Sequence, residues 1–318
     1  MTDTAAPQYP AAYNELMRLM REAATLRSTS SLLGWDQETY MPPAAAEFRA
    51  EQMALLSSLL HERFTSPRVG ELLAQCEADP VLADDATAAA NLRELRRDYG
   101  RATRLPPDLV HEMAETSSRA MHVWREARDR NDFATFAPWL EKVVGLVRRK
   151  AEAYGWPEGG EPYDALLDEF EPGMTTARVT QTFDALRAGL APLIRAVAES
   201  GVRPDTTWQQ ARIPVARQMA FNRALVEKMG FDLEAGRLDE SVHPFCEGVG
   251  PGDTRMTSRY TEDQVASALA STMHETGHAL YEQNLPKAER FGEPLGESAS
   301  MGIHESQSRM WENLVGRS

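Results

Sequence analysis

The sequence has few of the features that would tie a chain to a membrane, an export route or a disulfide framework. Only two cysteines, Cys76 and Cys246, occur among 318 residues, and they follow no pattern. We therefore expect two small core residues and no disulfide. No run of eighteen apolar residues is present, and the first residues lack a basic stretch followed by an apolar one. This predicts a soluble, cytoplasmic protein.

Basic residues are scarce relative to acidic ones. Lys and Arg total 34 against 48 Asp and Glu, so the formal net charge is −14 at pH 7. An acidic surface repels phosphate backbones and anionic lipids, so we expect neither nucleic acid nor membrane as a partner. The hydrophobic share of 42% is sufficient for one large domain, or two closely packed lobes, with a real core.

Helical periodicity runs through most of the chain. Apolar residues recur every three or four positions in the stretches 13–33, 45–62, 69–76, 86–99, 107–128, 133–154, 165–170, 176–200 and 214–228. The segment 241–260 is different, because it is rich in glycine and its part 255–260 alternates like a strand. The sequence thus predicts a mainly α fold with a small β-sheet just before residue 265.

The pentapeptide His274-Glu275-Thr276-Gly277-His278 is the most informative feature of the chain. On a helix, His274 and His278 lie one turn apart on one face, where both imidazoles can bind the same Zn²⁺. Glu275 can then accept the proton of an activated water, so the pattern predicts metal-assisted hydrolysis of an amide bond. The alternatives are a chance match and a helix that carries two surface histidines.

The flanking sequence favours the metal interpretation. Pro251-Gly252 and Pro286 leave room for a helix, and Thr261 with Gln264 matches a capping box at its start. Apolar or small residues then recur at helical spacing: Val265, Leu269, Thr272, Met273 and Leu280. This face centres away from the two histidines. We expect the helix to bury that face and to turn its histidines toward a cleft.

A catalytic zinc site needs a third protein ligand and leaves the fourth position to water. Tyr281 and Asn284 stand three and six residues after His278, which excludes the metzincin continuation. The remaining candidates follow the pentapeptide: Glu289, Glu293, Glu297, His304 and Glu305. The stretch 286–296 has the character of a loop, and helical patterning resumes at Glu297.

Glu305 is the best geometric candidate, and Glu297 is the second. Ile303, Met310 and Leu314 share one face of the last helix. Glu305 points roughly 160° away from Ile303, on a helix expected to run antiparallel to the metal helix. For Glu305 and Glu297 alike, the alternative is a solvated surface carboxylate.

Two residues of the glycine-rich segment are candidate substrate-binding groups. His243 can donate a hydrogen bond to substrate, unless the backbone beside Pro244 satisfies it. The planar guanidinium of Arg255 can pair with a substrate carboxylate, with a salt bridge to Asp253 as the alternative. The strand at 255–260 can pair with an extended peptide or serve only as a structural hairpin.

Four motifs occur in order along the chain: His243-Pro244-Phe245, Asp253-Thr254-Arg255-Met256-Thr257, the pentapeptide, and His304-Glu305-Ser306-Gln307. With the segments 35–42 and 163–168, they give a sequence that resembles the carboxypeptidase Taq family from about residue 8 to the last residue. The resemblance implies a helical metallopeptidase fold with a deep cleft. It also implies His274, His278 and Glu305 as metal ligands and Glu275 as general base.

The same resemblance implies a function. Members of the family are metal-dependent carboxypeptidases that remove C-terminal residues with broad specificity and are commonly homodimers. We therefore expect peptide substrates, a Zn²⁺ cofactor with Co²⁺ as the alternative, and a homodimer. One alternative is an endopeptidase with the same metal geometry. Another is an inactive or regulatory segment of such an enzyme.

Family members continue well past the last motif, whereas this sequence stops at Ser318. We expect residues 1–318 to be a single, C-terminally incomplete peptidase domain from the N-terminal part of a longer enzyme. Its first 130 or so residues are expected to form a helical lid, and about 240–318 to hold the metal site. The part that follows is expected to complete the cleft wall.

Overall fold

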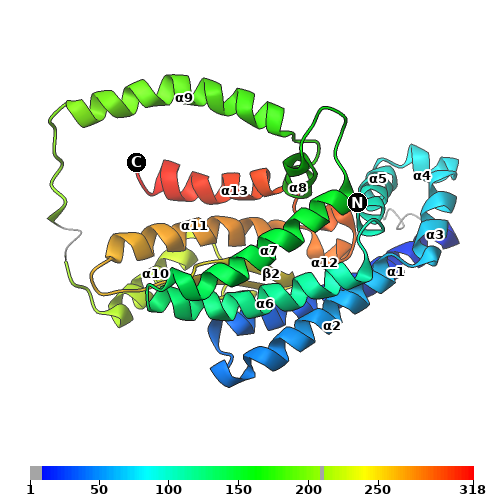
Figure 1. The fold of residues 1–318 in the computed structure, drawn as a ribbon, viewed down its shortest axis with the longest axis horizontal. Helices are drawn as coiled ribbons and strands as arrows, with labels where there is room; N and C mark the ends of the chain where they lie inside the picture. The colour runs from blue at the N-terminus through cyan, green and yellow to red at the C-terminus, as the bar shows by residue number, and fades with distance from the viewer. Residues whose placement is uncertain (1–8, 208–210) are drawn as a thin grey trace, which may run out of the picture. The chain divides into compact units, whose positions relative to one another are not determined.

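The computed structural model describes residues 9–207 and 211–318, so the first eight residues of the predicted lid region lie outside it. The fold is mainly helical, as predicted (Figure 1). The helices that match predicted stretches are α1 (Ala11–Thr39), α2 (Ala46–Phe64), α3 (Pro67–Glu77), α5 (Ala86–Ala102), α6 (Pro107–Asp129), α7 (Phe133–Tyr154), α8 (Pro162–Phe170), α9 (Thr176–Glu199) and α10 (Val215–Met229). None of the described helices is long and apolar enough to span a bilayer.

The chain divides into two compact units. Unit 1 comprises Met1–Val147, Glu247–Thr254 and Asn284–Ala299. Unit 2 comprises Arg148–Cys246, Arg255–Gln283 and Ser300–Ser318. The predicted lid helices belong to unit 1, and the predicted metal-site region is divided between the two units. The lid role itself stays a prediction.

Unit 1 has a hydrophobic core built by helices α1, α3, α5 and the short α4 (Pro80–Asp84). Leu16, Leu72 and Leu82 are fully buried there, and each such side chain stabilises the fold by about 1.5–3 kcal/mol relative to an exposed one. Cys76 is buried in the same cluster as a free thiol, which agrees with its predicted place in a core. Helix α4 was not predicted because five residues are too few for a periodic pattern.

The predicted loop at 286–296 carries regular structure, so that prediction is wrong in part. It contains α12 (Lys287–Arg290) and the 3₁₀ helix η3 (Pro294–Gly296), both too short to produce a pattern. Asn91, fully buried on α5, donates a hydrogen bond to Glu293 at 2.8 Å and accepts one from the Leu295 amide at 3.1 Å. These contacts fix the segment within unit 1.

The sheet has the strand order β1–β3–β2, with β1 at Gly236–Glu240, β2 at Cys246–Gly250 and β3 at Asp253–Ser258. The predicted strand at 255–260 corresponds to β3. Pro251-Gly252 joins β2 to β3, and Gly252 has φ 74°, a backbone conformation that residues with side chains rarely adopt. Strands β1 and β2 were not predicted, because each has five residues and includes glycine.

Helix α11 (Val265–Asn284) carries the pentapeptide and packs on α10 and β3 through small and polar residues. Its buried side is formed by Ala268, Thr272, Thr276 and Ala279. Asn222 of α10 donates a hydrogen bond to the Thr272 hydroxyl at 2.9 Å, and that hydroxyl donates to Ser258 of β3 at 2.9 Å. A buried polar network therefore fixes α11 from behind.

Two predictions about α11 are wrong. Leu269, which was expected on the buried face, is half-buried and lines a pocket. Met273 is buried, as predicted, although it also lines that pocket. The small Ala and Thr side chains let α11 approach its neighbours closely, so they take the buried side. The predicted capping box does not form, because the helix begins at Val265 and the buried Thr261 hydroxyl bonds to no residue that the structure describes.

Helix α13 (Met301–Arg309) continues into a short π-helical segment, η4 (Met310–Val315), and lies beside α11 (Figure 1). It begins four residues later than the predicted start at Glu297. The Ser300 hydroxyl caps it by accepting a hydrogen bond from the Ile303 amide at 3.2 Å. The Glu171 carboxylate accepts another from the Gly302 amide at 3.0 Å.

Candidate metal centre

The side chains of His274, His278 and Glu305 meet between α11 and α13. The Nε2 atoms of His274 and His278 lie 3.5 and 3.3 Å from the same oxygen, Oε2 of Glu305. One ligand atom from each of the three residues lies within 4.8 Å of the others. Two imidazoles and one carboxylate form a donor set typical of catalytic zinc. The three predicted ligands are therefore brought together in an arrangement that fits a metal ion.

The close approach of α13 to α11 depends on Gly277. A Cβ atom at this position would lie 2.6 Å from the carbonyl oxygen of Gln307 and 2.6 Å from Cα of Ser308. Real Cβ atoms essentially never come so close to backbone. The backbone of α13 thus packs directly on the pentapeptide, and any larger residue at 277 would push Glu305 away from the histidines.

The other candidate ligands are not part of this group. Glu289 and Glu293 belong to unit 1, as does Glu297, which follows η3. In residues 9–207 and 211–318 the group of His274, His278 and Glu305 is the one set with metal-ligand spacing, and none of these three acids belongs to it. His304 lies on α13 beside Glu305, and its own hydrogen bonds join it to α11.

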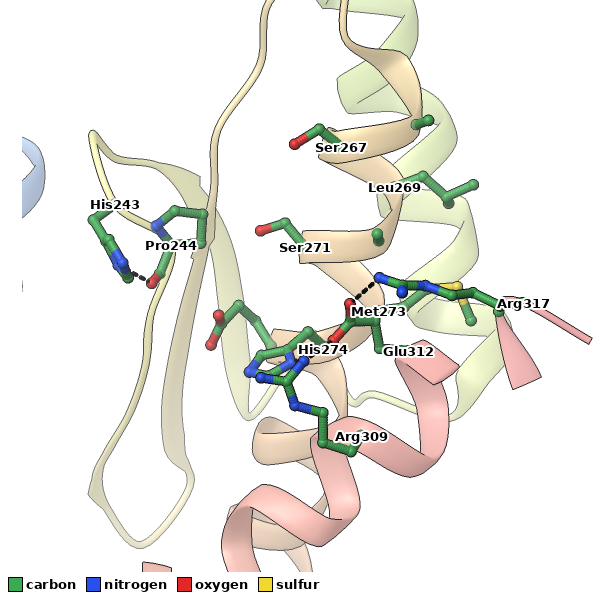
Figure 2. Close-up of a pocket in the computed structure, with 14 residues that line it drawn as sticks. His243, Pro244, Ser267, Leu269, Ser271, Met273, His274, Arg309, Glu312 and Arg317 are labelled. Atoms are coloured by element: carbon green, nitrogen blue, oxygen red, sulfur yellow. Dashed lines mark hydrogen bonds and ion pairs between the residues drawn. The ribbon is translucent and has the colours of Figure 1, made fainter. Parts of the chain in front are cut away.

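A buried carboxylate, not predicted from the sequence, supports His274. Glu312 is 9% exposed, and its Oε2 lies 3.0 Å from Nδ1 of His274. Arg309 and Arg317 donate hydrogen bonds to Glu312 at 3.0 and 2.5 Å, so two guanidinium groups hold it beside the imidazole (Figure 2). Metal-binding histidines usually donate their second nitrogen to such a carboxylate. Glu312 stands two helical turns after Glu305, a spacing that the sequence shows.

The electrostatics of the site differ from one group to the next. Burial raises the pKa of Glu275 to about 8, and the charges of Glu305 and Glu312 add to the effect. Burial also lowers the pKa of His278 to about 4, with His304 and His274 contributing, so this imidazole is neutral at pH 7, as a metal ligand must be. Although burial opposes it, hydrogen bonds from Arg309 and Ser308 hold the pKa of Glu305 below its usual value.

A pocket of about 770 Å³ adjoins His274 and Glu275 (Figure 2). Its volume lies within the usual range for small-ligand sites. His243 is one of the residues that line it, and its Nδ1 is also within 2.7 Å of the Pro244 carbonyl oxygen. Arg255 is half-buried on β3 and is not among the described residues that line the pocket.

Comparison with known proteins decides the family. Residues 15–318 match the carboxypeptidase Taq (M32) metallopeptidases. The chain belongs to this family. It is 48% identical over 316 residues to Thermostable carboxypeptidase 1 of Thermus thermophilus, covering 97% of this chain and 62% of that protein. It is 36% identical over 304 residues to Carboxypeptidase 1 of Bacillus subtilis, covering 95% of this chain and 60% of that protein.

Solved structures agree with the assignment of this M32 chain. A crystal structure of BsuCP matches with a TM-score of 0.92 and 34% identity, over 97% of this chain and 61% of that one. An M32 carboxypeptidase from Deinococcus radiodurans matches with a TM-score of 0.83 and 40% identity, over 97% and 61% of the two chains. The M32 chain thus spans about three fifths of the length of the curated relatives it matches.

Proposed function

We propose that this chain carries the metal centre and general base of a metal-dependent carboxypeptidase with broad specificity for peptides. The observation that carries the proposal is the convergence of His274 Nε2, His278 Nε2 and Glu305 Oε2 beside a pocket that holds Glu275. When bound to these three residues, Zn²⁺, or Co²⁺ as the alternative, supplies Lewis-acid activation of water and of the scissile carbonyl. Membership of the M32 family supports peptides as the substrate class.

Glu275 is the proposed general base. It lies next to His274 on α11, and only 7% of it is exposed. Burial raises the pKa of Glu275, so this carboxylate is a stronger base than a solvated one and accepts a proton from water more readily. Having taken that proton, Glu275 can return it to the leaving amine, which completes the proton balance of peptide hydrolysis.

The test is hydrolysis of an N-blocked dipeptide by the chain with added Zn²⁺ or Co²⁺, and again with a chelator. We expect release of the C-terminal amino acid only with metal. Glu275→Gln should bind metal like wild type and lose activity by roughly 10²–10⁴-fold. Glu289→Gln, a carboxylate of unit 1, is the matched control. Wild-type turnover by Glu275→Gln would refute the general-base role.

A C-terminally amidated peptide and a metal-binding measurement separate the alternative functions. Cleavage of a peptide whose C-terminus is amidated would favour the endopeptidase. Metal binding without turnover of any peptide would favour the inactive or regulatory segment.

We propose that His243 and Arg255 bind the substrate. The place of His243 in the pocket supports its role, and His243→Ala should raise KM more than it lowers kcat. We also propose a homodimer, on the family resemblance, and a cytoplasmic location, on the sequence of the first residues. Sedimentation of the purified protein tests the dimer.

A further inference from the structure

A chain of hydrogen bonds leads from His278 away from the metal centre. Nδ1 of His278 lies 2.5 Å from Nδ1 of His304, and Nε2 of His304 lies 2.7 Å from Oε1 of Glu282. The side chains of His304 and Glu282 are 16% and 11% exposed, so water has little access to them. Tyr281 packs edge-on against the His304 ring, with ring centroids 5.1 Å apart. The proposed hydrolysis uses none of these three supporting side chains.

The hydrogen bonds from His278 through His304 to Glu282 determine which nitrogen of each imidazole is protonated. A neutral imidazole has one N–H and one acceptor nitrogen. If Nε2 of His278 uses its lone pair as a ligand, its proton is on Nδ1 and is donated to Nδ1 of His304. His304 must then carry its own proton on Nε2, from which it donates to the Glu282 carboxylate. Every donor in the chain meets an acceptor, and the reverse assignment would place two lone pairs or two protons face to face.

We propose that His304 and Glu282 are positioning residues, which hold the His278 ring in the tautomer and orientation that a metal ligand needs. The proposal rests on the metal centre proposed above. Glu282 lies one helical turn after His278 on α11, and His304 lies next to Glu305 on α13. Helix α13 thus contributes the ligand Glu305, and the adjacent residue His304 supports the ligand His278.

The two histidine ligands are therefore supported differently. A charged carboxylate, Glu312, contacts His274 directly, whereas a neutral imidazole stands between His278 and the carboxylate of Glu282. Loss of such outer partners typically weakens metal binding 10–100-fold. We expect a loss of that size when His304 is replaced.

The experiment measures Zn²⁺ affinity by competition with a chromophoric chelator, together with the visible absorption spectrum of the Co²⁺-loaded protein. His304→Phe keeps a ring of similar size and should bind Zn²⁺ roughly 10–100-fold more weakly, with a changed Co²⁺ spectrum. Glu282→Gln should lose less, because its amide oxygen can still accept the His304 proton. His122→Phe, a histidine of α6 in unit 1, is the control and should match wild type in both measurements.

A second measurement does not depend on a variant that folds. Multiple-bond ¹H–¹⁵N spectra of the Zn²⁺-loaded wild type, labelled at histidine, report which nitrogen of each ring is protonated. We expect His278 to be protonated at Nδ1 and His304 at Nε2. A proton on Nδ1 of His304, or wild-type Zn²⁺ affinity in His304→Phe, would overturn the proposal. A wild-type chain that binds no Zn²⁺ would instead overturn the metal centre, and this inference with it.

Discussion

The two helices that form the metal centre are held in the protein in different ways. Thr272 and Thr276 of α11 are fully buried, and a polar network ties this helix to α10 and β3. On α13 and η4, by contrast, Ile303, Met310 and Leu314 are 47%, 37% and 73% exposed. Helix α11 is therefore positioned by the fold behind it, whereas the contacts of α13 are its close packing on Gly277, the Glu171 carboxylate at its first turn and the ionisable groups of the site.

The histidine ligands and the glutamate ligand are therefore held in place by different contacts. His274 and His278 belong to a helix that a buried polar network holds from behind. Glu305 belongs to a helix whose place depends on Gly277 and on contacts with ionisable side chains such as His274. A metal ion that binds residues of both helices would stabilise their association, since a ligand stabilises the state that binds it. The following predictions test this contrast, beginning with the largest expected effect.

Replacing Glu305 with alanine removes the one ligand that α13 contributes to the cluster. We expect Zn²⁺ affinity to fall at least ~100-fold, which corresponds to about 2.7 kcal/mol. The affinity is measured by chelator competition. Glu297→Ala, the control at the second sequence candidate, should leave affinity unchanged. If Glu297→Ala weakened binding and Glu305→Ala did not, the assignment of the third ligand would be wrong.

Replacing Gly277 with alanine forces α13 away from α11 without touching a ligand. A Cβ atom placed 2.6 Å from backbone atoms requires a shift of the helix, and such overpacking costs about 1–3 kcal/mol. We expect weaker Zn²⁺ binding and faster amide hydrogen exchange in residues 301–309, with the exchange of α11 little changed.

The matched control is Gly189→Ala on α9, where a Cβ atom would meet nothing within 4 Å. It should bind metal like wild type and gain up to about 1 kcal/mol of stability from helix propensity. Unchanged Zn²⁺ affinity and unchanged exchange of α13 in Gly277→Ala would show that the close contact does not position Glu305.

The same contrast shows how far the sequence predicts this site. The spacing of His274 and His278 places them on one face of any helix, and the angle between Ile303 and Glu305 likewise holds for any helix. Periodicity does not say what covers a face, however. The apolar face of α13 is exposed, and Leu269 and Met273 of α11 line the pocket.

The sequence also places the residues that support the ligands at helical spacing from them, but spacing alone does not identify them as supports. Glu282 follows His278 by one turn, and Glu312 follows Glu305 by two turns. Most carboxylates on helices of an acidic chain are solvated, so spacing alone gives no reason to prefer these two. They become partners of the histidines only through the packing of α13 on α11, a tertiary contact that depends on Gly277.

Replacing Thr272 with valine tests the support behind α11. Valine keeps the shape but removes the hydroxyl, which leaves Asn222 of α10 and Ser258 of β3 without this buried partner. We expect the free energy of unfolding to fall by about 1–3 kcal/mol in urea denaturation. Thr182→Val on α9, where the hydroxyl is exposed, should change it by less than about 0.5 kcal/mol. Equal effects would show that the network does not stabilise α11.

The buried carboxyl of Glu275 predicts a pH dependence of stability in the metal-free protein. Its pKa is 4.5 ordinarily and about 8 in the folded state, so between these values the folded state holds a proton that the unfolded chain lacks. Stability from this group should therefore fall as pH rises, by at most about 1.4 kcal/mol per pH unit. His278 acts in the opposite direction between pH 4 and 6.5, because its pKa is lowered from 6.5 to about 4.

The effect of Glu275 should consequently be seen without this opposition from about pH 6.5 to 8, measured by urea denaturation with chelator present. Glu275→Gln has no charge to bury, so its stability should fall less steeply over that range. Glu289→Gln should keep the wild-type slope, since the Glu289 side chain is exposed. If Glu275→Gln kept the wild-type slope as well, burial of Glu275 on α11 would not disfavour the charged form of this carboxyl group.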